Sequence, residues 1–142
     1  MSRSDGATGS GIGQVKESKK RILIIEDDRE MRFLLKDFIE EQDGFEVEEV
    51  RDGSEAFPKL MAKDFDLIIT DIRMPGLSGL DIIPGLKNLQ PGVSIIAITA
   101  FGSEEIQRKV LARGAHAYLE KPVSLARLRS LIEDLIEREK TV

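Results

Sequence analysis

The chain has 142 residues, of which 41% are hydrophobic and 33% are charged, and its formal net charge at pH 7 is −5. This length and apolar fraction predict one packed domain and exclude a wholly disordered chain. The absence of cysteine excludes disulfides and thiolate sites, the acidic balance argues against nucleic-acid binding by this domain, and no apolar run reaches the roughly 18 residues of a membrane span.

The first 20 residues differ in composition from the rest of the chain. Glycine and serine alternate there and are followed by lysines, a composition that cannot bury a core, so we expect a flexible tail or linker before a domain at 21–140. The stretch 9–13 superficially resembles a nucleotide-binding loop, but that motif needs a strand before it and a helix after it, and neither is predicted. No signal-peptide core is present, so we expect a cytoplasmic protein without membrane contact.

The next 40 residues predict two strands and two helices. The apolar run 22–25 has the length of a strand, and alternation over 45–50 predicts an edge or half-buried strand. A second helix is expected over 54–62, with Ser54 as its N-cap. The first helix, which Gly44 is expected to end, carries apolar residues on one face: Met31, Leu34, Leu35, Phe38 and Ile39.

Two helices of this region contain a proline. The third strand is predicted over 67–70 and the third helix over 80–89. Proline inside a helix removes a hydrogen bond and costs about 3 kcal/mol. We expect a tightened first turn to absorb Pro58, and we expect the Pro84-Gly85 pair to break, kink or shorten the third helix near Ile83.

The remaining elements continue the alternation. The fourth strand is predicted over 93–98 and the fifth over 115–119, with a helix capped by Ser103 between them and a last helix starting at Ser124. Apolar strands that alternate with amphipathic helices indicate an α/β fold with a parallel sheet covered on both faces. His116 stands alone near the fifth strand, so a structural role is favoured over a metal site.

Polar residues follow several predicted strands where each strand ends. In parallel sheets these ends meet at one edge, where ligands bind. Clustered carboxylates raise one another's pKa, and they are tolerated together when a divalent cation lies among them. Oxygen donors without histidine or cysteine favour Mg²⁺ over Zn²⁺. The residues are Glu26, Asp27 and Asp28 after the first strand, Asp71 after the third, Thr99 at the fourth, and Lys121-Pro122 after the fifth.

Each feature taken singly also has a plain structural interpretation. An acidic triplet often forms a solvated turn, Asp28 can cap the following helix, and Lys-Pro often forms a turn. Their occurrence at consecutive strand ends favours a site. A carboxylate beside Mg²⁺ and an ammonium can attack a phosphoryl group, and a threonine hydroxyl can donate to a phosphoryl oxygen.

The chain resembles the receiver domains of bacterial two-component response regulators over about residues 20–138. The resemblance implies a flavodoxin-like, doubly wound (βα)5 fold with a five-stranded parallel sheet in the order 2-1-3-4-5. It is carried by the segments Ile24-Ile25-Glu26-Asp27-Asp28, Thr70-Asp71-Ile72-Arg73-Met74-Pro75-Gly76, Ile98-Thr99-Ala100 and Lys121-Pro122.

The resemblance implies a role for each matching residue. Asp71 would accept a phosphoryl group from a histidine kinase or a histidine phosphotransfer protein, and Lys121 would pair with the acceptor. Mg²⁺ would be held by Glu26, Asp27, Asp71 and the backbone carbonyl of Arg73. Thr99 and Tyr118 would form the switch beside the small Ala100, and the positions of Arg73 and Phe101 would tune phosphoryl loss. The expected catalytic residues are therefore Asp71, Lys121 and Thr99. The Lys121–Pro122 bond would be cis, which makes Pro122 the expected cis-proline.

The resemblance also implies a readout surface and leaves alternatives open. The fourth helix, fifth strand and fifth helix would change on phosphorylation and offer a possible homodimer surface. The domain would be a signalling switch that catalyses only its own phosphotransfer and autodephosphorylation. A single-domain relay, a fragment of a longer regulator and a scaffold receiver that is not phosphorylated remain open.

Two rivals from other classes are disfavoured by the sequence. A phosphatase of the haloacid dehalogenase type needs an acid two residues after its nucleophile, where this chain has Arg73. A flavodoxin-like cofactor binder needs a phosphate-cradling loop after the first strand, where this chain has acids.

Overall fold

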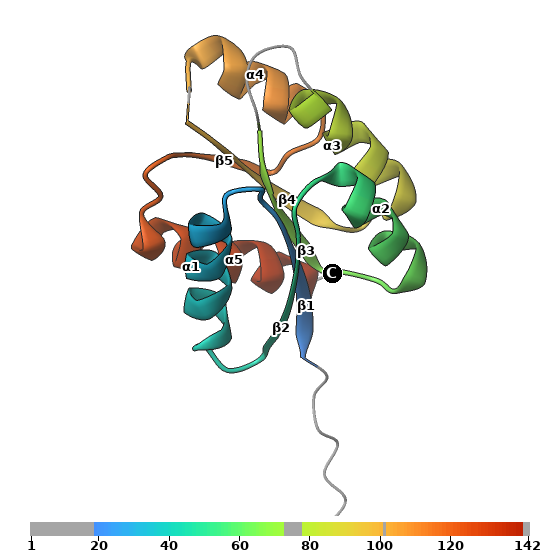
Figure 1. Ribbon diagram of the computed structural model, residues 1–142, viewed down its shortest axis with the longest axis vertical. Coiled ribbons are helices and arrows are strands. Elements are labelled where there is room, and N and C mark those ends of the chain that lie inside the picture. Colours follow the sequence, from blue (N-terminus) through green and yellow to red (C-terminus); the bar gives the residue numbers. More distant parts are fainter. Residues whose placement is uncertain (1–18, 73–77, 101, 141–142) are drawn as a thin grey trace, which may run out of the picture.

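Strands and helices alternate along the residues that the structure, a computed structural model, describes: 19–72, 78–100 and 102–140. Figure 1 shows this alternation along the chain. The strands are β1 (Lys20–Ile25), β2 (Phe45–Val50), β3 (Leu67–Asp71), β4 (Ser94–Thr99) and β5 (Ala117–Glu120). The helices are α1 (Arg29–Glu40), α2 (Gly53–Ala62), α3 (Ser78–Leu89), α4 (Glu104–Ala112) and α5 (Leu125–Lys140).

The strands form one parallel sheet in the order β2-β1-β3-β4-β5. The predicted fold and strand order are therefore confirmed, and β2 lies at an edge, as its alternating sequence predicts. The register sets Ile25 of β1 beside Thr70 of β3, and Asp71 beside Ile98 of β4. The carboxyl ends of these neighbouring strands consequently meet at one end of the sheet.

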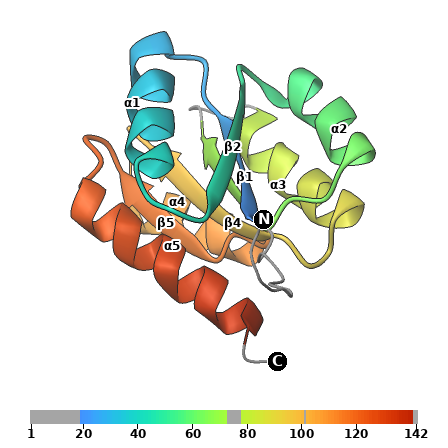
Figure 2. The ribbon, with the colours of Figure 1, turned by 90° about the horizontal axis from the view of Figure 1, so that it is seen from below.

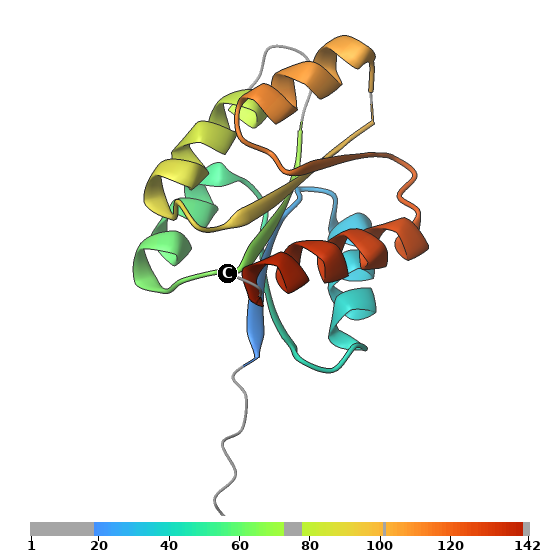
Figure 3. The same cartoon turned by 180° about the vertical axis from the view of Figure 1, so that it is seen from behind.

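Helices cover both faces of the sheet. α1 and α5 lie on one face and α2, α3 and α4 on the other, as Figures 2 and 3 show from below and from behind. Alternate residues of β1 enter separate cores: Ile22 and Ile24 pack with the α1 and α5 side, while Leu23 and Ile25 pack with the other side. Each such fully buried side chain contributes about 1.5–3 kcal/mol of transfer free energy. The alternation along β1 therefore stabilises the packing of helices on both faces of the sheet.

Helix α1 follows its predicted pattern with two differences. Asp28 is its N-cap, because its Oδ1 accepts from the backbone N–H of Glu30 and Met31. Leu34, however, is 45% exposed and so does not join the core. The helix ends at Glu40 with its C-cap at Glu41, and Gly44 is not its end but a turn residue with φ 99° before β2.

The predicted N-cap of α2 is wrong by two residues. Asp52 is the cap, since its carboxylate accepts from the backbone N–H of Glu55 at 3.1 Å and from the Ser54 hydroxyl at 2.7 Å. An aspartate at this position also opposes the positive end of the helix dipole. Because the helix starts earlier than predicted, Pro58 is its sixth residue and lies beyond the first turn.

The prediction that α3 is broken or shortened near Ile83 is also wrong. The helix is continuous over twelve residues with Pro84 inside it. Ile83 and Leu86 flank the proline and are both fully buried, which offsets the lost hydrogen bond. Gly85 allows close packing against α2, since a Cβ there would lie 3.2 Å from the Phe57 ring.

The last two strands begin later than predicted. β4 starts at Ser94 rather than Val93, and β5 starts at Ala117 rather than Ala115. His116 precedes β5 and is bonded to β4: its backbone N–H donates to the Ile95 carbonyl, and its imidazole Nδ1 accepts from the Ile95 N–H at 3.1 Å. Its side chain therefore has the structural role that the sequence favours.

Candidate functional site

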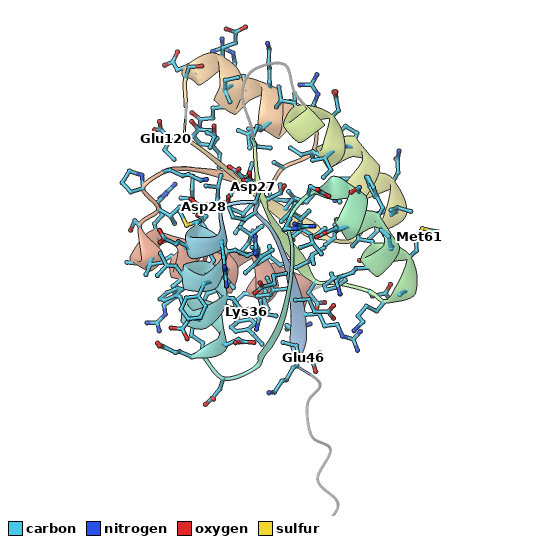
Figure 4. All side chains as sticks on the ribbon, viewed as in Figure 1. Asp27, Asp28, Lys36, Glu46, Met61 and Glu120 are labelled. Carbon is cyan, nitrogen blue, oxygen red and sulfur yellow. The ribbon has the colours of Figure 1, made fainter. Side chains whose placement is uncertain are left out.

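The predicted polar residues gather at the carboxyl end of the sheet. Glu26 and Asp27 follow β1, and Asp71 is the last residue of β3. Figure 4 shows Asp27 at this end of the sheet and Glu46 at the opposite end. Parallel pairing of β1 with β3 brings these residues together although they are 45 positions apart in the chain.

Glu26, Asp27 and Asp71 form an acidic cluster. Each offers a carboxylate oxygen, and these oxygens all lie within 4.8 Å of one another. Among the described side chains, the ammonium against this cluster is that of Lys121, with Nζ 3.2 Å from Glu26 Oε1 and 3.3 Å from Asp71 Oδ1. Three carboxylates and one ammonium leave the cluster with a surplus of negative charge.

Glu26 is the most buried member of the acidic cluster, and its side chain is 2% exposed. Its Oε2 accepts from the Asp28 backbone N–H at 3.1 Å. Its Oε1 has no hydrogen-bond donor among the described residues, because the contact with Lys121 is an ion pair without hydrogen-bond geometry. Burial raises the pKa of this carboxyl, and the Asp71 charge raises it further, against the lowering effect of the Asp28 N–H and Lys121.

Asp71 and Lys121 are perturbed by the same surroundings. Burial raises the pKa of Asp71 although Lys121 opposes the shift. For Lys121, burial alone would lower the pKa, but the Asp71 and Glu26 carboxylates outweigh it and raise the pKa. The ammonium is therefore held charged, while the carboxylates are disfavoured as ions.

The acidic cluster fits a divalent oxygen-binding cation such as Mg²⁺. All its donors are carboxylate oxygens, and Glu26 Oε1 is a buried acceptor whose full hydrogen-bonding capacity is unused. A divalent charge would also balance the surplus of negative charge. Arg73, whose carbonyl is the further expected ligand, lies outside the described residues, as does Phe101.

The expected switch residues lie at the neighbouring strand ends. Thr99 ends β4 and is 1% exposed, and its carbonyl accepts from the Lys121 backbone N–H at 2.8 Å. Ala100 follows it and is exposed. Tyr118 lies on β5 and is half-buried against the core under α2, α3 and α4. The Lys121–Pro122 bond is cis.

Gly102 makes room for the side chain of Tyr118. A Cβ at this position would overlap the Tyr118 hydroxyl and lie 2.4 Å from Glu120 Oε2. Burial raises the pKa of Tyr118, and the Glu120 charge raises it further. The sequence analysis did not identify Gly102, because its importance depends on contacts with the side chains of β5.

A hollow of about 1010 Å³ opens beside the acidic cluster. It reaches from the ends of β1 and β3 toward the starts of α2 and α3, where Arg51, Ser54, Phe57, Asp81 and Ile82 line it. The acidic cluster therefore faces a hollow that opens to solvent.

Arg32 is a second residue of the site that the sequence analysis missed. It lies on α1, and its guanidinium donates to the Glu26 carbonyl at 2.8 Å. Its position four residues after Asp28, on the first turns of the helix behind the acids, is the signal that could have identified it.

The family of the chain follows from comparison with known proteins. Residues 22–133 match the family model described as "Response regulator receiver domain". The chemotaxis protein CheY of Halobacterium salinarum is 33% identical over 118 residues, which are 82% of this chain and 97% of that protein. The transcriptional regulatory protein CusR of Escherichia coli K12 is 35% identical over 123 residues, which are 86% of this chain and 53% of CusR.

Some curated relatives are much longer than the match. The aligned part is 26% of the response regulator protein PilR of Pseudomonas aeruginosa, at 35% identity and 81% coverage of this chain. The chain thus spans about a quarter to a half of the length of these two regulators. None of the described helices combines the length and apolar character needed to cross a bilayer.

Solved structures agree with the fold. The receiver domain protein of Methanospirillum hungatei JF-1 superposes with a TM-score of 0.77 at 34% identity, covering 88% of this chain and all of that chain. A two-component response regulator from Clostridium difficile gives a TM-score of 0.80 at 25% identity, covering 87% and 100%. With the family model matched over most of its length, the chain belongs to the response regulator receiver domains of two-component signalling.

Proposed function

We propose that this receiver domain accepts a phosphoryl group on Asp71 from a histidine kinase or a histidine phosphotransfer protein. The observation that carries the proposal is the contact of the Lys121 ammonium with both Asp71 and Glu26 beside three clustered carboxylates. In this arrangement the Asp71 carboxylate can act as the nucleophile next to the fixed positive charge of Lys121, as formation of an acyl phosphate requires.

In the proposed step an Asp71 carboxylate oxygen forms a bond to phosphorus. The P–N bond of a phosphohistidine breaks at the same time, and its electron pair leaves with the imidazole; with acetyl phosphate, the P–O bond breaks and acetate leaves. Lys121, already 3.3 Å from Asp71 Oδ1, is placed to pair with the transferred oxygens.

Glu26, Asp27 and Asp71 would hold Mg²⁺, with the Arg73 carbonyl as a further ligand. When bound, the ion supplies a Lewis acid that neutralises charge on the phosphoryl oxygens. The buried Glu26 Oε1, which makes an ion pair with Lys121 but no hydrogen bond among the described residues, supports this assignment. Autodephosphorylation would return the domain to its starting state by water attack on the same phosphorus.

The proposed output is a change at the surface of α4, β5 and α5. Phosphorylation adds charge and acceptor oxygens beside β4, whose last residue Thr99 carries a hydroxyl. Thr99 moving toward these oxygens would free space near Ala100 and bias the position of Tyr118, and thereby shift an existing equilibrium. The same surface would serve partner binding or a homodimer.

The test is the intact mass of the chain after incubation with acetyl phosphate, with Mg²⁺ or with EDTA. We expect a gain of one phosphoryl group that requires Mg²⁺ and is lost in Asp71→Ala. The control is Asp64→Ala, which removes an exposed carboxylate before β3 and should leave the gain unchanged. A gain that persists in Asp71→Ala would disprove the assignment of the acceptor.

A scaffold receiver that is not phosphorylated is the alternative that this experiment separates. It predicts no mass gain with acetyl phosphate and none with a phosphorylated histidine kinase. A relay and a direct effector both predict the gain, and they differ in whether the phosphoryl group passes on to a second histidine protein.

A further inference from the structure

We infer that Arg32 is a positioning residue for the proposed Mg²⁺ site: it fixes the backbone of Glu26 and so sets the carboxylates of Glu26 and Asp27. The inference rests on the proposed function, because it concerns how the chain holds the ion that the phosphotransfer would use. Arg32 is on α1, and its hydrogen bonds go to the Glu26 carbonyl and to Glu49, not to the carboxylates of the acidic cluster.

The guanidinium of Arg32 links α1 to β2 and to the residue that follows β1. Its Nη1 donates to the Glu26 carbonyl at 2.8 Å, and its Nε donates to Glu49 Oε1 on β2 at 3.1 Å. The Arg32 side chain is 13% exposed, and that of Glu49 is 35% exposed. A charge-assisted hydrogen bond to a backbone carbonyl is short and directional, so it restrains the peptide that links Glu26 to Asp27.

Glu26 is thereby held at each of its polar groups. Its backbone N–H donates to the Val50 carbonyl at 3.1 Å, and its carbonyl accepts from Arg32. Its Oε2 accepts from the Asp28 N–H, and its Oε1 lies 3.2 Å from the Lys121 ammonium. Of these contacts, the one from Arg32 is made at the peptide shared with Asp27, so it controls both residues of the pair.

The chemistry of arginine suits this position. Glu49 balances the Arg32 charge, so the pair acts through geometry and not by offsetting the negative surplus of the acidic cluster. The planar guanidinium donates in two directions at once, whereas a lysine ammonium at the end of a flexible stem does not reproduce that fork. Removing a residue that holds a metal ligand in place typically weakens metal binding by about 10-fold to 100-fold.

The experiment is a calorimetric titration of the full chain with MgCl2, together with phosphorylation by acetyl phosphate at a series of Mg²⁺ concentrations. Arg32→Met keeps the apolar stem and removes the donors. We expect its Kd for Mg²⁺ to rise about 10-fold, and we expect the Mg²⁺ concentration for half-maximal phosphorylation to rise equally, while the rate at saturating Mg²⁺ changes less than about 3-fold.

Arg29→Met is the matched control. It removes the same charge from the exposed first residue of the same helix, without the contact to Glu26, and we expect the wild-type Kd. Arg32→Lys restores the charge but not the fork, and we expect it to bind Mg²⁺ as weakly as Arg32→Met. Glu49→Gln leaves Arg32 in place with a weaker anchor, and we expect a Kd about 2-fold to 3-fold above wild type; this variant tests the inference if Arg32→Met does not fold.

The outcomes separate the two proposals. Mg²⁺ binding by the wild-type chain with an unchanged Kd in folded Arg32→Met would overturn the Arg32 inference and leave the proposed function standing. An equal loss in Arg29→Met, or recovery in Arg32→Lys, would show a charge effect and overturn positioning. If the wild-type chain does not bind Mg²⁺ at all, the metal site and the Arg32 inference fall together.

Discussion

The molecule contains two clusters of carboxylate and lysine with opposite electrostatics. Glu48 of β2 lies between two lysines of the α2 region, 3.0 Å from Lys59 Nζ and 2.7 Å from Lys63 Nζ, and its pKa is lowered, first by Lys63 and then by Lys59. At the acidic cluster, Glu26 and Asp71 share Lys121, and the pKa of each carboxyl is raised, first by burial.

The difference lies in burial and in the ratio of charges. Glu48 is 23% exposed and has two ammonium partners, so ionisation is favoured. Glu26 is 2% exposed, and it shares one ammonium with Asp71. The first cluster stabilises the fold as it stands, whereas the second stores unfavourable charge that a divalent cation would relieve. Removing a carboxylate charge should therefore stabilise the protein at the acidic cluster and destabilise it at Glu48.

The largest effect is expected from Lys121→Met. Without Mg²⁺, this change leaves buried carboxylates unpaired, and we expect a loss of about 3 kcal/mol in the free energy of unfolding at pH 7.5. The loss should shrink as pH falls through the raised pKa values of Glu26 and Asp71, because the two carboxyls then take up protons. Urea unfolding followed by circular dichroism in EDTA measures the loss at each pH. Lys59→Met at the Glu48 cluster is the control, with an expected loss below about 1 kcal/mol, and an equal loss at every pH would contradict the electrostatic explanation.

The next effect is stabilisation by Mg²⁺. A ligand that binds only the folded state adds about 2.7 kcal/mol when its free concentration is 100 times Kd. We expect this gain at pH 7.5 in the wild-type chain and a much smaller one in Asp27→Asn, which lacks one of the proposed Mg²⁺ ligands. Unfolding in urea with and without Mg²⁺ checks it. Glu48→Gln should keep the full gain, and a gain of the same size in Asp27→Asn would remove Asp27 from the site.

The pH dependence of stability should identify the raised pKa values. A raised pKa in the folded state means that the native protein binds more protons than the unfolded chain. The stabilisation from this proton uptake is present below about pH 4 and is lost as pH rises through the raised pKa. Without Mg²⁺, Asp71→Asn should therefore be more stable than wild type at pH 7.5, by about 1 kcal/mol, and the gain should disappear toward pH 4. A destabilised Asp71→Asn at pH 7.5 would contradict the raised pKa.

The smallest effect is expected at the other cluster, with the opposite sign. The lowered pKa of Glu48 contributes stability above about pH 4 that is lost as pH falls through the folded value. Glu48→Gln should lose about 0.5 kcal/mol at pH 7.5, because the group is partly exposed. The loss should vanish as pH falls through the lowered folded-state pKa, because the wild-type carboxyl is then protonated. Thermal unfolding above and below that pKa distinguishes this from a packing defect, which would persist at low pH.

By itself, the sequence determined the fold class and the acids and lysine that meet at one end of the sheet, but not Gly102 or Arg32. Apolar runs of strand length between helices of period 3.6 restrict the chain to a parallel α/β sheet, since local periodicity decides which residues can face a core. Three acids, a threonine and a lysine each stand where a strand ends, so their convergence follows from the topology alone. The Lys-Pro and Asp-x-x-Met-Pro-Gly segments then identified the family resemblance that the comparisons bear out.

Only the tertiary structure decided how neighbouring elements support one another. Helix α3 runs through Pro84 because Ile83 and Leu86 are buried, and because Gly85 lies against Phe57 of α2, 28 residues earlier in the chain. The N-cap of α2 is Asp52 and not the predicted Ser54. The start of the helix is set by the conformation of the backbone, which the pattern of apolar residues does not reveal. Arg32 meets the Glu26 carbonyl and the Glu49 carboxylate only when α1 packs against β2 and the end of β1, so tertiary packing and not sequence periodicity decides these two contacts.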